Sequence, residues 1–301
     1  MRICVAATPK VALPTLEYLR LSEHELVSVI TQPDRPAGRG QKSRESAVSE
    51  WALRNGIHCA KPESEEETLR ALAGADLLLT IGYGVILPLK VISAPSHGSI
   101  NLHFSLLPRW RGAAPVQRAI EAGDSVSGVT VFALDEGMDT GPIYLEKRFA
   151  LDADITSDEL LNELSELGVE AVTETLELID KGVRPRTQSV EGATRAFKVS
   201  KEEAEVDWSQ SAPVISQKIR AFTSSPGAWT IFRGSTVKIF TPLISELELE
   251  PGQILIQDKK LFIGTATFAL EIGGVQPSGK AAMAASSWVN GVRLATGERF
   301  G

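Results

Sequence analysis

The sequence predicts an α/β domain with a mostly parallel sheet, followed by a smaller β-rich domain. Three observations support this fold class. In the first half, short apolar runs alternate with amphipathic stretches of helical period, as in βαβ units. The apolar run at residues 77–79 shows no polar alternation, as expected for a strand covered on both faces. After residue 206, β-rich runs follow at close spacing, separated by Gly and Pro.

The elements of the first domain follow in chain order. The predicted strands span residues 2–7, 25–31, 76–81, 98–103, 128–134 and 143–150, with a short apolar run at 57–60. The predicted helices span residues 11–21, 46–54, 65–73 and 156–181. The last helix begins with a capping-box pattern, Thr156 and Glu159, and Gly182 follows its end. We therefore expect a Rossmann-like domain over residues 1–187.

The second domain has a different pattern. Residues 188–206 are polar and lack clear periodicity, so we expect a linker. Beyond it, residues 212–222 have helical period, and the predicted strands span residues 229–233, 237–240, 253–256, 260–263 and 268–272. This spacing suggests that residues 207–301 form a small, OB-like antiparallel β-barrel.

The composition indicates the broad class of protein. A chain of 301 residues with 43% hydrophobic residues is long enough for two cores. No apolar run approaches the roughly 18 residues of a membrane span, and the N-terminus lacks signal-peptide features. Cys4 and Cys59 lie in apolar runs and are expected to be free thiols, which fits a cytoplasmic protein. The net charge of −7 argues against nucleic acid, but residues 207–301 hold 9 Lys/Arg against 7 Asp/Glu.

The stretch at residues 99–115 is the most informative, since a strand runs there into a loop stiffened by Pro and Gly. Ligands of open α/β sheets bind at the carboxyl ends of strands. Asn101 and His103 are two residues apart, so on a strand they share a face. An amide donor beside an imidazole could stabilise an oxyanion and move a proton. Taken alone, the pair fits a structural role equally well.

A second loop at residues 135–142 carries Asp139 between two glycines. An aspartate near His103 would orient the imidazole and increase its basicity. From spacing alone, we favour the interpretation that Asp139 caps its own loop over a role beside His103.

These residues resemble the 10-formyltetrahydrofolate-dependent formyltransferase family. The resemblance rests on Asn-Leu-His-x-Ser-Leu-Leu-Pro at residues 101–108, Arg-Gly-Ala-Ala-Pro at 111–115 and Asp-Thr-Gly at 139–141. It implies that Asn101, His103 and Asp139 are catalytic and that 10-formyltetrahydrofolate is the co-substrate. It also implies a folate site lined by Ser105, Leu106, Leu107 and Pro108.

Other motifs resemble those members of the family that formylate the methionine of initiator methionyl-tRNA for translation initiation. They lie at residues 31–40, 198–208 and 276–283. Residues 224–229 depart from the Asn-Pro-Trp-Pro-like run that such members have. The resemblance implies a C-terminal tRNA-binding domain and tRNA contacts by Arg35, Arg39 and Lys42. These three cations lie in a segment rich in Pro and Gly that we expect to be an exposed, mobile loop.

Other interpretations remain open. The chain could formylate another amine, such as glycinamide ribonucleotide or an amino sugar, or act as a hydrolytic relative. A non-catalytic folate- or RNA-binding module is a further alternative. The spacing of His97, His103 and Asp139 fits no common zinc pattern, so we expect no metal. We expect a monomer.

Overall fold

The computed structural model describes residues 1–37, 42–295 and 297–301; for residues 35–37 and 42–44 it describes the backbone alone. The chain divides into two compact units. Unit 1 comprises residues 1–115, 126–150 and 161–197, and unit 2 comprises residues 116–125, 151–160 and 198–301. The expected linker is thus divided, with 188–197 in unit 1 and 198–206 in unit 2. The domain boundaries at 187 and 207 stay a prediction.

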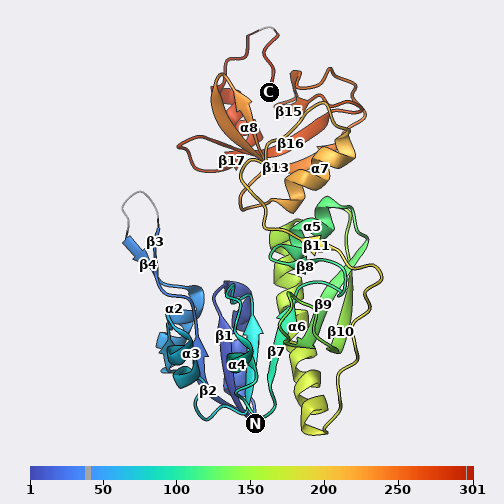
Figure 1. The fold of residues 1–301 in the computed structure, drawn as a ribbon. Coiled ribbons are helices and arrows are strands. Elements are labelled where there is room, and N and C mark those ends of the chain that lie inside the picture. The colour runs from blue at the N-terminus through green and yellow to red at the C-terminus, as the bar shows by residue number, and fades with distance from the viewer. Residues whose placement is uncertain (38–41, 296) are drawn as a thin grey trace. The chain divides into compact units, whose positions relative to one another are not determined.

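Unit 1 contains a seven-stranded sheet in the order β10-β9-β7-β6-β1-β2-β5, and Figure 1 follows this succession from β2 across to β10. Its strands are β1 (Arg2–Ala7), β2 (Glu25–Ile30), β5 (Cys59–Ala60), β6 (Leu77–Ile81), β7 (Ser99–His103), β9 (Val126–Ala133) and β10 (Ile143–Ala150). The five strands from β7 to β5 are parallel, which confirms the predicted parallel-sheet fold. β9 runs antiparallel to both β7 and β10.

Helices cover both faces of this sheet, so its central strands are buried on both sides. All five residues of β6 are buried. On one face, Leu78 packs with Leu72 and Val91. On the other, Gly168 lies so close to Leu102 that an added Cβ would meet Leu102 Cδ2 at 2.7 Å. The helical segments of unit 1 are η1 (Lys10–Ala12), α1 (Leu13–Leu21), α2 (Ala47–Arg54), α3 (Glu65–Ala71), α4 (Leu89–Ile92) and, from residue 161 on, α6 (Ser157–Asp180). Apart from its first residue, α5 (Pro115–Glu121) belongs to unit 2.

The predicted capping box of α6 is present. The backbone N–H of Thr156 donates to Glu159 Oε2 at 2.9 Å, and the backbone N–H of Glu159 donates to Thr156 Oγ1 at 3.3 Å. This reciprocal pair satisfies two donors that the first turn of the helix leaves open. Within the described part of the chain, no helix is long and apolar enough to cross a membrane.

Unit 2 contains an antiparallel sheet, as predicted, with six strands where five were predicted. Its order is β12-β13-β16-β15-β14, with β17 paired to β16. Its elements are α7 (Ala212–Ala221), β12 (Trp229–Phe232), β13 (Ser235–Ile244), β14 (Ile254–Gln257), β15 (Lys260–Ile263), β16 (Leu270–Pro277), β17 (Met283–Ala284) and α8 (Ala285–Gly291). In the core of unit 2, apolar residues of α7 and α8 pack against the inner side of this sheet.

The strand ladders of unit 2 form an open path, so the expected closed barrel is not reached by strand pairing among the described residues. The last residues reach both ends of the path, through a backbone hydrogen bond to β12 and an isolated antiparallel bridge between Arg299 and Gln253 just before β14. The N–H of Gly301 donates to Ile231 O of β12 at 3.0 Å, and the N–H of Phe300 donates to Gly252 O, just before β14, at 2.9 Å.

Two segments expected to be irregular contain short strands. β11 (Arg195–Ala196), in the expected linker, pairs in parallel with β8 (Arg111–Gly112). β3 (Arg35–Ala37) pairs antiparallel with β4 (Lys42–Arg44), where a mobile loop was expected. Neither pairing has a signal in periodicity, because each strand has only two or three residues.

Candidate active site

The first two candidate residues share one face of β7. Asn101 pairs with Thr80 of the neighbouring strand β6, and His103 lies two residues further on, at the carboxyl end of the strand. Thr80 Oγ1 donates a hydrogen bond to Asn101 Oδ1 at 2.6 Å. Because this bond occupies the amide oxygen, the amide NH2 group is the part of Asn101 that can donate to a ligand.

His103 is buried and its tautomer is determined by a backbone carbonyl. The residue is 5% exposed, and its Nε2 lies 2.9 Å from the carbonyl oxygen of Trp110. A carbonyl oxygen can only accept a hydrogen bond, so Nε2 carries a proton. The ring of Phe132 meets the imidazole edge to face, with 6.4 Å between the ring centroids. Nδ1 is therefore the nitrogen that can gain or release a proton.

Asp139 lies in the loop between β9 and β10 and approaches that nitrogen. Its Oδ2 lies 3.7 Å from His103 Nδ1 and accepts a hydrogen bond from the backbone N–H of Gly112 at 2.7 Å. A separation of 3.7 Å is too long for a hydrogen bond but short enough for an ion pair. Nδ1 therefore has a carboxylate beside it but no hydrogen bond to that carboxylate.

A different residue caps the Asp139 loop. Asp135 Oδ1 accepts hydrogen bonds from the backbone N–H of Gly137 at 3.0 Å and from the hydroxyl of Thr140 at 2.8 Å. Asp139 itself has a φ of +54°, a left-handed conformation that aspartate tolerates better than most residues. Its carboxylate is bonded to another loop, so local capping does not account for it.

The loop that carries Trp110 and Gly112 is held by the expected linker. The backbone N–H of Trp110 donates to Thr194 Oγ1 at 2.9 Å, and β8 pairs with β11 immediately afterwards. Gly112 has a φ of +126°, and a Cβ at this position would lie 2.6 Å from Ala196 O. A glycine is therefore required where β8 meets β11.

Gln188 links this loop to Asp139, and sequence reasoning did not identify it. Its Nε2 donates to the carbonyl oxygens of Asp139 at 3.0 Å and Gly141 at 2.8 Å. Its Oε1 accepts from Arg111 Nε at 3.0 Å and Nη2 at 2.5 Å. Gln188 is buried, so all its polar atoms are used in holding the two loops together. It lies in a polar stretch without periodicity, where only the fold reveals its role.

The expected folate-lining residues divide into two kinds. Ser105 and Leu107 are buried, whereas Leu106 and Pro108 are half-buried. Ser105 Oγ donates to Arg109 O at 2.7 Å, so its hydroxyl closes the loop. The exposed surface of this segment is therefore contributed by Leu106 and Pro108.

An apolar loop follows β6 beside this segment. Val85 is 48% exposed and Ile86 is 80% exposed. β6 and β7 are parallel neighbours, so the loops that follow them leave the same edge of the sheet. Sequence analysis did not identify these two residues, although an apolar pair just after a buried strand was a usable signal.

The expected tRNA-contacting residues are only partly described. Arg39 lies outside the described residues, and Arg35 and Lys42 are described by their backbone in β3 and β4. Among the residues that the structure describes, no group of three or more His, Cys, Asp or Glu side chains could hold a metal ion.

Comparison with family models gives two matches. Residues 1–176 match the model described as formyl transferase. Residues 198–293 match the model described as formyl transferase, C-terminal domain. The two matches together cover most of the chain.

Individual proteins are similar over almost the whole of this chain. The chain is 42% identical to a methionyl-tRNA formyltransferase of Salinispora arenicola, over 99% of both chains. Among solved structures, HypX from Aquifex aeolicus in complex with tetrahydrofolic acid has a TM-score of 0.71 at 22% identity, covering 96% of this chain and 47% of that one. A methionyl-tRNA formyltransferase from Clostridium thermocellum has a TM-score of 0.60 at 18% identity, covering 90% and 98%. The two structural matches show a shared fold.

Proposed function

The chain belongs to the formyl transferase family, and we propose that it transfers the formyl group of 10-formyltetrahydrofolate to the amino group of methionine on initiator methionyl-tRNA. This reaction supplies formylated initiator tRNA for translation initiation. The main support is that Asn101 and His103 of one strand end and Asp139 of another loop come together, with His103 Nδ1 and Asp139 Oδ2 3.7 Å apart. The full-length similarity to a named methionyl-tRNA formyltransferase supports the choice of acceptor.

Asn101 and His103 stabilise the negative charge that develops on the formyl oxygen when the amine attacks. Thr80 holds the amide oxygen of Asn101, which leaves the amide N–H groups to donate to the formyl oxygen. The Trp110 carbonyl holds Nε2–H of His103, so Nδ1–H is the second donor when the ring is protonated. Removal of one such donor costs roughly 10²–10³ in rate. We expect Asn101→Ala and His103→Ala each to lose at least this much in single-turnover formyl transfer, and near-normal turnover by either variant would remove it from this scheme.

Asp139 stabilises the positive charge on the protonated imidazole and accepts the proton that the attacking amine loses. Its position is set by the Gly112 N–H and by Gln188, which binds its carbonyl oxygen. The new C–N bond forms to the methionine nitrogen, the bond between the formyl carbon and the folate nitrogen breaks, and the proton passes from the amine to that nitrogen. Proton movement between positioned groups of this kind contributes typically about 10²–10⁴ in rate.

We place the folate against the two loops that follow β6 and β7. Val85 and Ile86 are exposed apolar side chains of the first loop, and Leu106 and Pro108 are the half-buried residues of the second. A flat pterin ring is a suitable partner for exposed apolar surface beside polar catalytic groups. Ser105 and Leu107 support the loop from within.

The tRNA side of the proposal rests on charge. Arg35, Arg39 and Lys42 carry three positive charges in one segment, and such residues contact phosphates or unpaired bases. We assign formyl transfer to residues 1–187 and tRNA binding to this segment together with residues 207–301. The enzyme acts as a monomer in the cytoplasm, where initiator tRNA is charged and used.

Arg39→Ala is expected to weaken tRNA binding and reduce its dependence on salt concentration. An unchanged affinity and salt slope would contradict the role of Arg39.

The decisive experiment is formyl transfer by the purified chain. We expect rapid formylation of charged initiator tRNA with 10-formyltetrahydrofolate as the donor, and little with glycinamide ribonucleotide or an amino sugar nucleotide as the acceptor. Transfer to one of these alternative acceptors, with none to methionyl-tRNA, would refute the proposed acceptor. Release of formate without any acceptor would indicate a hydrolytic enzyme.

A further inference from the structure

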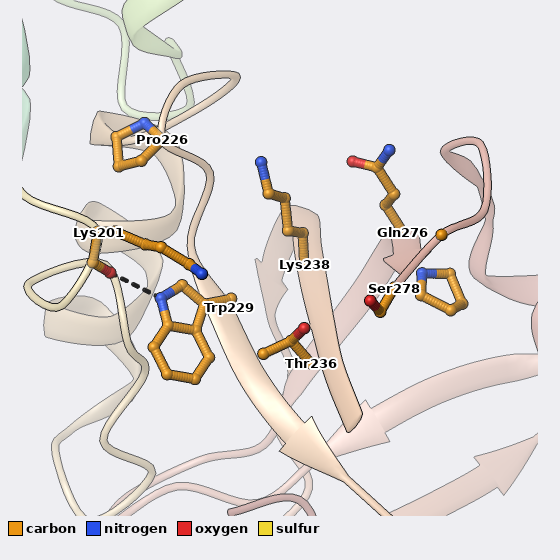
Figure 2. Close-up of a pocket in the computed structure, with 9 residues that line it drawn as sticks. Lys201, Pro226, Trp229, Thr236, Lys238, Gln276 and Ser278 are labelled. Carbon is orange, nitrogen blue, oxygen red and sulfur yellow. Dashed lines mark hydrogen bonds between the residues drawn. The ribbon is translucent and has the colours of Figure 1, made fainter. Parts of the chain in front are cut away.

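Unit 2 contains a pocket of about 390 Å³ that the proposed chemistry does not use. This volume lies within the range of about 300–1,000 Å³ that is typical of ligand sites. Its lining residues are Lys201, Pro226, Trp229, Thr236, Lys238, Gln276, Pro277, Ser278 and Gly279. We call it the Trp229 pocket. Three segments singled out in the sequence, near residues 201, 226 and 276, meet in it (Figure 2).

The floor of the pocket is one row of side chains across three strands. Trp229 of β12 pairs with Lys238 of β13, which pairs with Gln276 of β16. The flanking residues Val237 and Val275 are buried in the core of unit 2, so the row lies on the opposite, outward face of the sheet. Strand register therefore places an indole, an ammonium group and an amide side by side.

The pocket is positively charged. Figure 2 shows the Lys201 and Lys238 side chains extending into the same space beside Trp229. None of the nine lining residues is acidic, and among the described residues neither ammonium group has a hydrogen bond or ion pair. Glu202, the next residue in the chain, partly offsets the charge of Lys201. Two ammonium groups without ion pairs near one another still favour an anionic ligand such as a phosphate.

The pocket also has an aromatic surface and a polar side chain that suit a base. Trp229 Nε1 donates to Lys201 O at 2.7 Å, which fixes the plane of the half-buried indole. Gln276 Nε2 donates to Lys280 O at 3.1 Å, which leaves its Oε1 as an acceptor for a base N–H. Stacking on an aromatic ring together with lysine contacts to phosphate is how proteins hold single nucleotides of RNA.

We propose that the Trp229 pocket binds one nucleotide of the RNA substrate, with its phosphate between Lys201 and Lys238 and its base against Trp229. This inference rests on the proposed function, because it takes initiator tRNA as the substrate. It adds a recognition point in unit 2 to the basic segment at residues 35–42.

The test is titration of uncharged initiator tRNA at several salt concentrations. Lys201→Ala and Lys238→Ala should each weaken binding about tenfold and lower the slope of log K against log salt by about 0.7–0.9. Lys259→Ala, which removes the same charge from the turn between β14 and β15, is the matched control and should bind as the wild type does. Wild-type affinity and salt slope in both pocket variants would overturn the proposal.

A second pair of variants separates stacking from folding. Trp229→Leu should bind tRNA at least about fivefold more weakly, because base stacking contributes about 1–3 kcal/mol per base. Trp229→Phe keeps an aromatic face but loses the bond to Lys201 O, and it should retain most of the affinity. Equal binding by Trp229→Leu and the wild type, with equal thermal stability, would contradict the stacking role.

Two further measurements identify the ligand and isolate this inference. AMP as a probe should bind weakly and be displaced by tRNA; tight AMP binding that tRNA does not disturb would make the pocket a free-nucleotide site and overturn the proposal. Formylation of charged tRNA by the wild type is measured in parallel. If the wild type formylates tRNA while the pocket variants bind normally, the pocket proposal alone fails. If the wild type does not formylate tRNA, the proposed function fails.

Discussion

Replacement of Asp139 by asparagine tests the proposed chemistry directly. The asparagine side chain keeps the shape of the aspartate, and its amide oxygen can still accept the hydrogen bond from Gly112 N–H. What the substitution removes is the negative charge 3.7 Å from His103 Nδ1 and the group that accepts the amine proton. The loop should therefore stay in place while the electrostatic support of the imidazole is lost.

The size of the effect follows from this distance. Two unit charges 3.7 Å apart interact by about 4 kcal/mol at an effective dielectric constant of about 20. The Asp139 side chain is 17% exposed, so solvent screening is limited. Because about 1.4 kcal/mol corresponds to a factor of ten in rate, we expect Asp139→Asn to lower the rate of formyl transfer about 10³-fold.

The assay is single-turnover formylation of charged initiator tRNA with saturating 10-formyltetrahydrofolate. Glu136→Gln is the matched control, because it removes one charge from an exposed position of the same loop and should leave the rate unchanged. Both variants should unfold at the wild-type temperature. A rate for Asp139→Asn within about tenfold of the wild type would refute the electrostatic reasoning.

Three further predictions concern the supports of the site and the core. Gln188→Leu should lower kcat about 10²-fold with substrate affinity less affected, because both loop carbonyls lose their donor and a shift of about 1 Å near the chemistry costs this much. Gln188→Glu keeps the acceptor for Arg111 but not the donor, so it should show a similar defect. A wild-type kcat in both variants would contradict the positioning role of Gln188. Gly112→Ala should destabilise the protein by about 1–3 kcal/mol in urea unfolding, because the added Cβ meets a backbone oxygen at a positive φ; an unchanged midpoint would argue against that close approach. Burial raises the pKa of the Cys4 thiol to about 12. At pH 8 a disulfide reagent should therefore leave Cys4 unmodified in the folded protein, with Cys59 the one thiol that can react, and should modify both thiols in urea. Rapid reaction of both thiols without urea would contradict this prediction.

Much of the fold could be predicted because periodicity is a local property. The strands of the parallel sheet and the capping box of α6 each depend on residues close in sequence. Strand direction is not local, which is why the antiparallel pairing of β9 with β7 was not predicted. Likewise, the open path of ladders in unit 2 depends on pairings over long sequence distances.

The candidate site was predicted less completely than the fold. Asn101, His103 and Asp139 were singled out by the family resemblance, because their residue types and spacing alone fitted structural roles at least as well. Gln188 carried no such signal, since its importance comes from two carbonyl groups almost 50 residues away in sequence. Thr80 also carried no signal in the sequence, because it lies in a buried strand and contributes to the site through its hydrogen bond to the Asn101 amide.

The stretch between Gln188 and Thr194 has a practical consequence. Residues 189–193 are exposed, while Gln188 before them is buried and Thr194 after them is bonded to the Trp110 loop. A recognition site for a specific protease could be built into residues 190–192. The protease would then cut the backbone without breaking any strand of either sheet. Cleavage would leave Gln188 and Thr194 on separate chain ends, each held to the catalytic loops by its own contacts alone, and we expect it to lower the activity.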